Sequence, residues 1–346
     1  MVDRRSFLSS SLAGIAGLGL SDPRLGTDPK PLAVPKAKQV LRRTLGRTGL
    51  SLPVVSMGVM NADNPNLVRA ALEGGIVHFD TAHGYQRGRN EEMLGDVFRG
   101  AKRESFTLAT KVSPPGLDRR TGVFAAETRP EPFLDMFHLS LKRLQMDHVD
   151  ILFLHNVSRR DAVLFEPILK ALLQLKKEGK TRFIGVSTHG NEPEVIRAAA
   201  ESRAYDVVLT SYNFKQNHHA EVRAACMEAS KAGVGIIAMK TQAGVYFDRE
   251  KTRPINMVAA LKWALQEDFV TTAIPGFTTF DQLNTDLAVL ENLRMTDAER
   301  QDLAGAAKLS GLYCQQCGTC APQCPQDLPI PDLMRGYMYA AGYRTP

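Results

Sequence analysis

Four polar side chains of the kinds that carry protons follow predicted strands in the first half of the chain. Asp80, Lys111 and His155 end three apolar, β-branched runs, and Tyr85 lies in the loop five residues after Asp80. A tyrosine phenol has an ordinary pKa of about 10, so it is a poor acid at neutral pH. The ammonium of a nearby lysine would favour the phenolate and lower that pKa, and an aspartate paired with the lysine would keep it charged and oriented.

Such a set could give a proton to the alkoxide that develops when a carbonyl group receives a hydride. We therefore predict that Tyr85 is the general acid/base, Lys111 its perturber and Asp80 the orienter of the lysine. His155 would hydrogen-bond the substrate oxygen and fix its pose. Each residue taken singly also fits a structural role in a core or a loop. Their joint placement at strand ends favours catalysis.

A second group with chemical potential is the cysteine run near the C-terminus. Cys314, Cys317, Cys320 and Cys324 follow the spacing C-x2-C-x2-C-x3-C-P, which is the ferredoxin run for a [4Fe–4S] cluster. The first three are predicted ligands and Cys324 is the favoured fourth, with a three-iron cluster as the alternative. Zinc sites usually use two separated cysteine pairs, and disulfides would be expected in an oxidising compartment. The fifth cysteine, Cys226, lies on an apolar helical stripe and is predicted to be a core residue.

Eight short apolar runs alternate with amphipathic helical stretches, which is typical of a parallel α/β fold. The pattern predicts an α/β protein of the (β/α)8 TIM-barrel type, with an N-terminal β-hairpin over residues 40–52 and a C-terminal iron–sulfur extension. The rival is a doubly wound open sheet, but no G-x-G-x-x-G turn follows the first run. Asn64 and Gly74 should bound one helix, and another is expected over residues 165–178. The predicted strands cover residues 54–57, 76–80, 106–111, 149–155, 183–187, 207–210, 235–239 and 271–274.

Several short motifs resemble, in order, those of the aldo/keto reductase family. They are Leu-Gly-Arg-Thr-Gly-Leu at 45–50, Phe-Asp-Thr-Ala-His-Gly-Tyr at 79–85, Asn-Glu-Glu-Met-Leu-Gly at 90–95, Ala-Thr-Lys at 109–111, Leu-His at 154–155 and Ile-Pro-Gly at 274–276. The resemblance covers residues 43–290. It implies a (β/α)8 barrel, a nicotinamide cofactor, NAD(P)(H), bound across the barrel mouth, and a small carbonyl or alcohol substrate.

The resemblance also places the residues that would bind the cofactor. Ser187 stands where the family contacts the carboxamide, although Thr188 and Leu209 replace the family's usual Asn and Gln, and Met239 occupies the position that packs on the nicotinamide ring. Gly276 and Gln282 stand where basic residues hold the 2′-phosphate of NADP. The stretch 274–290 contains no Lys or Arg, so NADP preference is doubtful and we expect weak discrimination or a preference for NAD. Backbone amides near Thr278 could still hold a phosphate.

The N-terminus resembles a twin-arginine (Tat) export signal. Arg4-Arg5-Ser6-Phe7-Leu8 precedes an apolar run at 12–20 that is too short to span a bilayer. We therefore predict export by the Tat machinery to the periplasm, with the cleavage site left open. The expected organisation is a signal and linker over residues 1–38, the barrel over 39–295, and a helix with the iron–sulfur segment over 296–346.

The composition is that of an ordinary globular protein, with 44% hydrophobic and 23% charged residues. The net charge of +6 is spread along the chain, so no nucleic-acid partner is expected. The leading hypothesis is an oxidoreductase that transfers a hydride between a nicotinamide and a carbonyl or alcohol, with a cluster that relays electrons to a partner or braces the tail. The alternative is a non-catalytic redox or ligand-binding barrel.

Overall fold

The computed structural model describes most of the chain beyond the predicted leader. The leader and linker at 1–38, and Cys317 of the cysteine run, lie outside the described residues. The structure describes residues 39–118, 120–244, 246–247, 252–309, 314, 320–326, 328–338 and 340.

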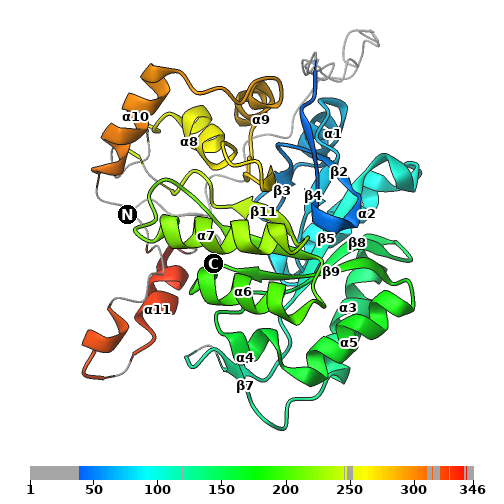
Figure 1. Ribbon diagram of the computed structural model, residues 1–346. Helices are drawn as coiled ribbons and strands as arrows, with labels where there is room; N and C mark the ends of the chain where they lie inside the picture. Colours follow the sequence, from blue (N-terminus) through cyan, green and yellow to red (C-terminus); the bar gives the residue numbers. More distant parts are fainter. Residues whose placement is uncertain are drawn as a thin grey trace, which may run out of the picture. The chain divides into compact units, whose positions relative to one another are not determined.

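Eight parallel strands form one sheet in the order β12-β11-β10-β9-β8-β5-β4-β3 (Figure 1). The two edge strands meet, because Val55 forms a parallel bridge with Ala273 and the Ser56 amide donates to the Ala273 carbonyl at 2.8 Å. The sheet is therefore closed, which confirms the predicted barrel and rules against the open doubly wound sheet. The strands are β3 (Met57–Gly58), β4 (His78–Asp80), β5 (Thr107–Val112), β8 (Val149–Leu154), β9 (Thr181–Thr188), β10 (Val207–Ser211), β11 (Gly235–Met239) and β12 (Val270–Ala273).

Helices follow the strands along the chain, and their starts carry the expected signals. The Asn64 side chain accepts from the Asn66 amide at 3.0 Å ahead of Pro65, so α1 begins where the sequence predicted. No helix in the described part of the chain is long and apolar enough to cross a membrane. The α-helices are α1 (Pro65–Glu73), α2 (Arg89–Phe98), α3 (Glu131–Leu144), α4 (Arg160–Val163), α5 (Glu166–Lys177), α6 (Glu192–Ser202), α7 (His219–Lys231), α8 (Met257–Ala264), α9 (Phe280–Leu287), α10 (Asp297–Ala307) and α11 (Ile330–Tyr337). Shorter elements are the hairpin strands β6 (Leu117–Asp118) and β7 (Val123–Phe124) and the 3-10 turns η1 (Gly46–Thr48), η2 (Tyr85–Gly88), η3 (Arg103–Ser105), η4 (Ala288–Leu290) and η5 (Ala321–Gln323).

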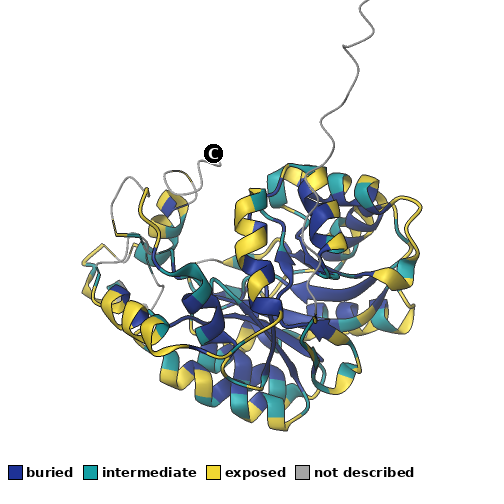
Figure 2. Cartoon of the chain, turned by 90° about the horizontal axis from the view of Figure 1, so that it is seen from above, coloured by how far each residue is buried: buried dark blue, intermediate teal, exposed yellow. Residues whose placement is uncertain are grey.

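Apolar side chains pack on both faces of the barrel wall, which is why the strands read as nearly continuous hydrophobic runs. In β8, Leu152 and Leu154 belong to the layer beneath the helices, whereas Ile151 and Phe153 belong to the inner cluster. Figure 2 shows the strands as buried and the outer faces of the helices as exposed. The inner cluster contains Leu45, Leu52, Ala109, Ile151, Phe153, Val207, Leu209, Ile237 and Ile274.

The predicted N-terminal hairpin forms the floor of the barrel. Its strands β1 (Arg42–Thr44) and β2 (Ser51–Pro53) pair antiparallel, and Leu45 and Leu52 pack into the inner cluster. The Arg47 amide donates to the Gly233 carbonyl at 2.7 Å, just before β11 begins. The hairpin therefore covers the end at which the strands start and leaves the opposite end open.

The backbone of Gly46 packs closely against the backbone of Gly235 in this floor. We predict that Gly46→Ala destabilises the protein. The residue has φ +47°, and an added Cβ would lie 2.3 Å from the backbone nitrogen of Gly235. We expect a loss of about 2–4 kcal/mol in the free energy of unfolding, measured by urea denaturation. Gly49→Ala is the matched control, because Gly49 also has a positive φ but nothing lies within 4 Å of its added Cβ. That variant should lose about 1 kcal/mol, and equal losses in the two variants would contradict the close approach.

Candidate active site

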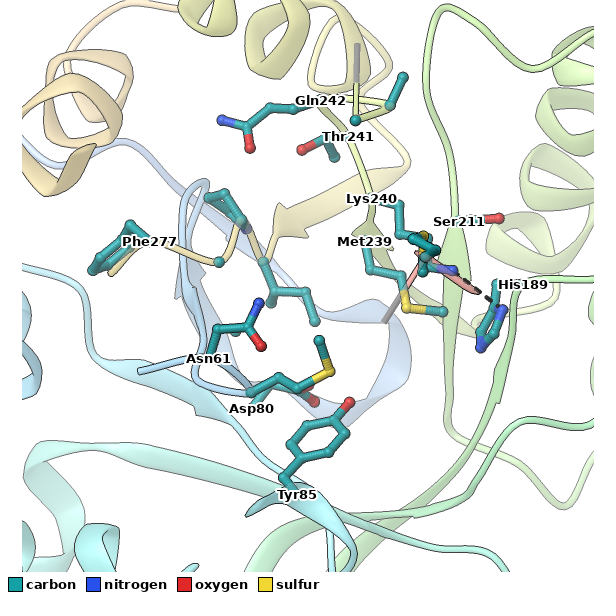
Figure 3. Close-up of a pocket in the computed structure, with 18 of the residues that line it drawn as sticks. Asn61, Asp80, Tyr85, His189, Ser211, Met239, Lys240, Thr241, Gln242 and Phe277 are labelled. Atoms are coloured by element: carbon teal, nitrogen blue, oxygen red, sulfur yellow. Dashed lines mark hydrogen bonds between the residues drawn. The ribbon is translucent and has the colours of Figure 1, made fainter. Parts of the chain in front are cut away.

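The four predicted catalytic residues come together at the open end of the barrel. Asp80 ends β4, Lys111 lies near the end of β5, His155 follows β8, and Tyr85 begins η2. All four line one cavity of about 1600 Å³. The carboxyl ends of parallel barrel strands meet at one mouth, so residues far apart in the sequence converge there. Figure 3 shows Tyr85 and Asp80 on one side of this cavity.

Lys111 is the centre of this group. Its side chain is almost fully buried, with a relative exposure of 1% for the residue. The ammonium donates to the carboxylate of Asp80, to the carbonyl of Thr81 at 2.7 Å and to the hydroxyl of Tyr85 at 3.4 Å. An ammonium has three donors and no acceptor. The three oxygens therefore match its hydrogen-bonding capacity and fix its position beside the phenol.

Asp80 balances the charge of Lys111 inside the protein. Burial raises the pKa of Asp80 above its ordinary value, and the Lys111 ammonium opposes that effect. Its Oδ1 accepts from Lys111, whereas its Oδ2 has no partner among the described residues. A buried charge requires a close counter-charge. The Lys111 ammonium therefore offsets part of the cost of burying the Asp80 charge at the base of the cavity.

His155 lies next to the phenol. The rings of Tyr85 and His155 meet edge to face, with centroids 5.9 Å apart and an interplanar angle of 80°. The His155 backbone amide donates to Val112 at 2.9 Å, which ties it to the end of β5. The mouth thus presents a phenol and an imidazole side by side.

The predicted cofactor residues are distributed along the same cavity, with one exception. Ser187, Met239, Gly276 and Gln282 line it, whereas Thr278 is not among the lining residues. The Thr278 amide donates to the Gln282 side-chain oxygen at 2.8 Å, so this amide is already used. A phosphate at this helix start would have to displace that contact.

Besides Asp80 Oδ2, buried oxygens of two further cavity residues have no hydrogen-bond partner among the described residues. The hydroxyl of Thr241 and the side-chain oxygen of Asn61 make no hydrogen bond within the described residues. Buried polar groups normally have a partner. The cavity also exceeds the roughly 300–1,000 Å³ of a typical single-ligand site. Both observations fit a site that takes a dinucleotide together with a small substrate (Figure 3).

Asp286 lies on α9 and lines the cavity with Gly276 and Gln282. It is buried, with a relative exposure of 3%, and burial raises its pKa to about 7. This end of the cavity therefore carries the acidic side chain of Asp286. The surrounding stretch 274–290 contains no Lys or Arg.

Sequence reasoning missed four basic residues of the cavity, of which Arg87 and Arg89 follow Tyr85 and the other two are Lys240 and Arg335. Lys240 directly follows β11, so the rule that barrel chemistry lies at strand ends could have found it. Arg335 lies in α11, in the C-terminal extension, and no pattern in the sequence places that helix against the barrel mouth.

The cysteine segment also reaches the cavity, because Cys314 is one of its lining residues. The described cysteines form no disulfide, and the Leu328 amide donates to the Cys324 sulfur at 3.4 Å. Among the described residues, which exclude Cys317, no group of three or more His, Cys, Asp or Glu could hold a metal. The iron–sulfur cluster stays a prediction. Cys226 is confirmed as a core residue, with a relative exposure of 1%.

The closed barrel carries a tyrosine, a lysine and an aspartate in one cavity at the carboxyl ends of its strands, which is where barrel enzymes have their active sites. A profile of the aldo/keto reductase family matches residues 56–259. The chain belongs to the aldo/keto reductase family.

Similarity to known proteins supports this family assignment. The uncharacterised oxidoreductase YrpG of Bacillus subtilis (strain 168) is 33% identical over 226 residues, 58% of this chain and 66% of that protein. The L-glyceraldehyde 3-phosphate reductase of Escherichia coli (strain K12) is 26% identical over 321 residues, 75% of this chain and 90% of that protein. The aldo-keto reductase of Klebsiella pneumoniae, solved in complex with NADPH, superposes with a TM-score of 0.60 at 20% identity, covering 78% of this chain and 97% of that one.

The protein is therefore an oxidoreductase that uses a nicotinamide cofactor, NAD(P)(H), on a carbonyl or alcohol substrate. The alternative of a non-catalytic redox or ligand-binding barrel is not favoured.

The buried carboxyl of Asp286 predicts a stability difference that depends on pH. Its pKa is about 7 in the folded protein, above the ordinary value of 3.8, so the unfolded chain loses this proton at lower pH. The wild type should therefore lose stability as the pH rises from about 4 to 7, by up to ~4 kcal/mol. Asp286→Asn lacks this loss, so its free energy of unfolding relative to wild type should rise over that interval and then level off.

This difference is measured by urea denaturation without cofactor at a series of pH values. Asp281→Asn is the control, because Asp281 is exposed in the first turn of the same helix. Parallel pH profiles for wild type and Asp286→Asn would contradict the burial of an ionisable carboxyl at this position.

Proposed function

We propose that Tyr85, Lys111, Asp80 and His155 together reduce a small carbonyl compound, or oxidise the corresponding alcohol, at the barrel mouth. The observation that carries this proposal is the position of the Lys111 ammonium. It contacts the Asp80 carboxylate on one side and lies 3.4 Å from the Tyr85 hydroxyl on the other. This arrangement stabilises a phenolate at the edge of a cavity large enough for a cofactor and a substrate.

The protein's own residues account for the movement of the proton. When bound, the nicotinamide supplies the hydride that the carbonyl carbon receives. Tyr85 gives its hydroxyl proton to the carbonyl oxygen, and the phenolate left behind is stabilised by Lys111. Asp80 keeps the lysine charged and in place. His155 hydrogen-bonds the same oxygen, and in the alcohol-oxidising direction the Tyr85 phenolate takes the proton back.

We predict that Tyr85→Phe lowers kcat for aldehyde reduction by about 100- to 10,000-fold, because it removes only the hydroxyl that donates the proton. The dissociation constant of the nicotinamide should be unchanged. Steady-state kinetics and cofactor fluorescence measure the two quantities. Tyr337→Phe is the matched control, because Tyr337 is exposed on α11, and it should retain full activity. Wild-type turnover in Tyr85→Phe would remove Tyr85 from the mechanism.

We propose further that the cofactor is NAD(H), or that the enzyme discriminates only weakly between NAD(H) and NADP(H). The stretch 274–290 offers no cation for a 2′-phosphate, and Gly276 and Gln282 stand where the family has basic residues. Asp286 adds a carboxylate to this end of the cavity. The carboxyl group of Asp286 can hydrogen-bond the ribose hydroxyls of NAD, as acidic residues do in dinucleotide-binding sheets, and in its ionised form it repels a phosphate.

Dissociation constants for the two reduced cofactors test this proposal. NADH should bind at least as tightly as NADPH. Asp286→Ala should weaken NADH about tenfold, the value of one charge-assisted hydrogen bond, and should leave NADPH unchanged or tighter. A preference of the wild type for NADPH by more than about tenfold would overturn the proposal.

We propose that Cys314, Cys317 and Cys320 hold a [4Fe–4S] cluster, with Cys324 as the fourth ligand. The support is the ferredoxin spacing of the run, together with the amide that donates to the Cys324 sulfur. The group would supply one-electron redox chemistry to a partner protein or would brace the extension.

We also propose that the chain leaves the cytoplasm through the Tat machinery and works in the periplasm. The Arg4-Arg5-Ser6-Phe7-Leu8 sequence supports this, since Tat carries folded proteins.

One fractionation experiment tests both proposals. The full-length chain, produced anaerobically in a Tat-competent bacterium, should appear in the periplasmic fraction with about four iron atoms per chain. Cys320→Ser should lose most of this iron, whereas Cys226→Ser, which changes a core cysteine outside the run, should keep it. Wild-type chain without iron in any fraction would refute the cluster, and iron-loaded chain retained in the cytoplasm would refute export.

A further inference from the structure

Three basic side chains line the cavity and take no part in the proposed proton transfer. They are Lys240 after β11, His189 after β9 and Arg335 on α11, which we call the basic wall. The Lys240 ammonium lies 3.3 Å from Nδ1 of His189. Figure 3 shows this pair on the side of the cavity away from Tyr85. Lys240 and His189 therefore line a part of the cavity that lies apart from Tyr85.

The backbone at Lys240 is held in an unusual conformation. Its φ is +56°, a left-handed value that costs a residue other than glycine of the order of 1 kcal/mol. The Lys240 carbonyl accepts from the Asn213 side chain at 3.1 Å and from the Ala243 amide at 3.0 Å. These bonds fix the turn, so the lysine projects from a defined position. Non-glycine residues in such conformations concentrate at functional sites.

The surroundings of Lys240 are poor in negative charge. Burial and then the charge of Arg335 lower the pKa of Lys240 to about 7, with Glu192 and the Cys314 thiol acting in the opposite direction. Glu192 is fully buried and its carboxylate already accepts from Ser211, Gln216 and His218. An anion beside Lys240 would therefore favour its ammonium form, which burial and the Arg335 charge disfavour.

Arg335 joins the basic wall to the substrate end of the cavity. Its guanidinium donates to the side-chain oxygen of Asn156 at 3.1 Å and lies 3.6 Å from Asp332 on its own helix. Asn156 directly follows His155 and also has a left-handed φ, of +60°. The Arg335 contact is thus one residue away from the histidine proposed to hold the substrate oxygen.

The two ends of the cavity differ in charge. Among the described residues that line it, the carboxylates are Asp80, which Lys111 neutralises, and Asp286 on α9. Arg335 contacts Asn156 beside His155, and Lys240 directly follows Met239, whereas Asp286 lines the cavity with Gly276 and Gln282. The basic wall therefore adds positive charge beside His155, and Arg87 and Arg89 add more next to Tyr85.

We propose that Lys240 and Arg335 bind a carboxylate or phosphate on the substrate, so that the enzyme acts on anionic carbonyl or hydroxy compounds. An ammonium and a guanidinium are the side chains that recognise such groups with charge-assisted hydrogen bonds. The inference rests on the proposed function, because the carbonyl or hydroxyl group of the same substrate must react at Tyr85.

Matched substrate pairs test it. Benzaldehyde is compared with 4-carboxybenzaldehyde, and glyceraldehyde with glyceraldehyde 3-phosphate, in wild type, Lys240→Gln, Arg335→Gln and Arg335→Lys. For at least one pair, both glutamine variants should lower kcat/KM for the charged member by about 10- to 100-fold and leave the neutral member within about twofold. Arg335→Lys should recover part of the loss. The pair that responds identifies carboxylate or phosphate. Lys170→Gln, an exposed site on α5, should change nothing.

Two results would overturn the inference while the proposed function stands. One is an equal loss on charged and neutral substrates or a loss confined to cofactor binding, and the other is unchanged kinetics in both glutamine variants. If wild type reduces none of these aldehydes, calorimetry with benzoate and glycerol 3-phosphate in the absence of oxidised nicotinamide, where neither can react, decides instead. Binding that Lys240→Gln abolishes supports the basic wall, and an absence of binding in wild type overturns it.

Discussion

The site depends on one buried positive charge. Lys111 can remain an ammonium inside the barrel only because Asp80 balances it and two further oxygens complete its hydrogen bonds. In a medium of low polarity such a charge acts strongly on its neighbours. The hydroxyl of Tyr85 lies 3.4 Å from this ammonium, so the ion pair acts on the residue that we propose as acid and base.

The pairing of barrel strands sets the relative positions of Asp80 and Lys111. Asp80 and Lys111 lie on adjacent parallel strands, β4 and β5, whose pairing aligns Asp80 with Ala109. The hairpin seals the far end with Leu45 and Leu52, which leaves one opening. Closure of the sheet, the apolar floor and the position of the ion pair are therefore parts of one arrangement. The loops at the open end are then free to specialise, as the basic wall and Asp286 illustrate.

Much of this could be read from the sequence, because strand patterning and the strand-end rule are local. The eight strands, the hairpin and the convergence of Tyr85 with Lys111 follow from alternation and from barrel geometry. The first strand was expected at 54–57, whereas β3 is Met57–Gly58, because Val55 serves to close the barrel instead. Arg335 could not be foreseen, since its position depends on how the C-terminal extension packs against the mouth. The cysteine run could be recognised as a ferredoxin motif, but the iron–sulfur cluster remains a prediction.

The central claim is that a hydride passes directly from the nicotinamide to a carbonyl carbon in this cavity. The most direct test is the mass of the alcohol produced in ordinary water with a cofactor deuterated at the transferring position. The account predicts one deuterium per product molecule, bonded to the carbon that was the carbonyl. An alcohol free of deuterium would contradict it, because both electrons would then have arrived without the hydride, as an electron-relaying barrel would deliver them.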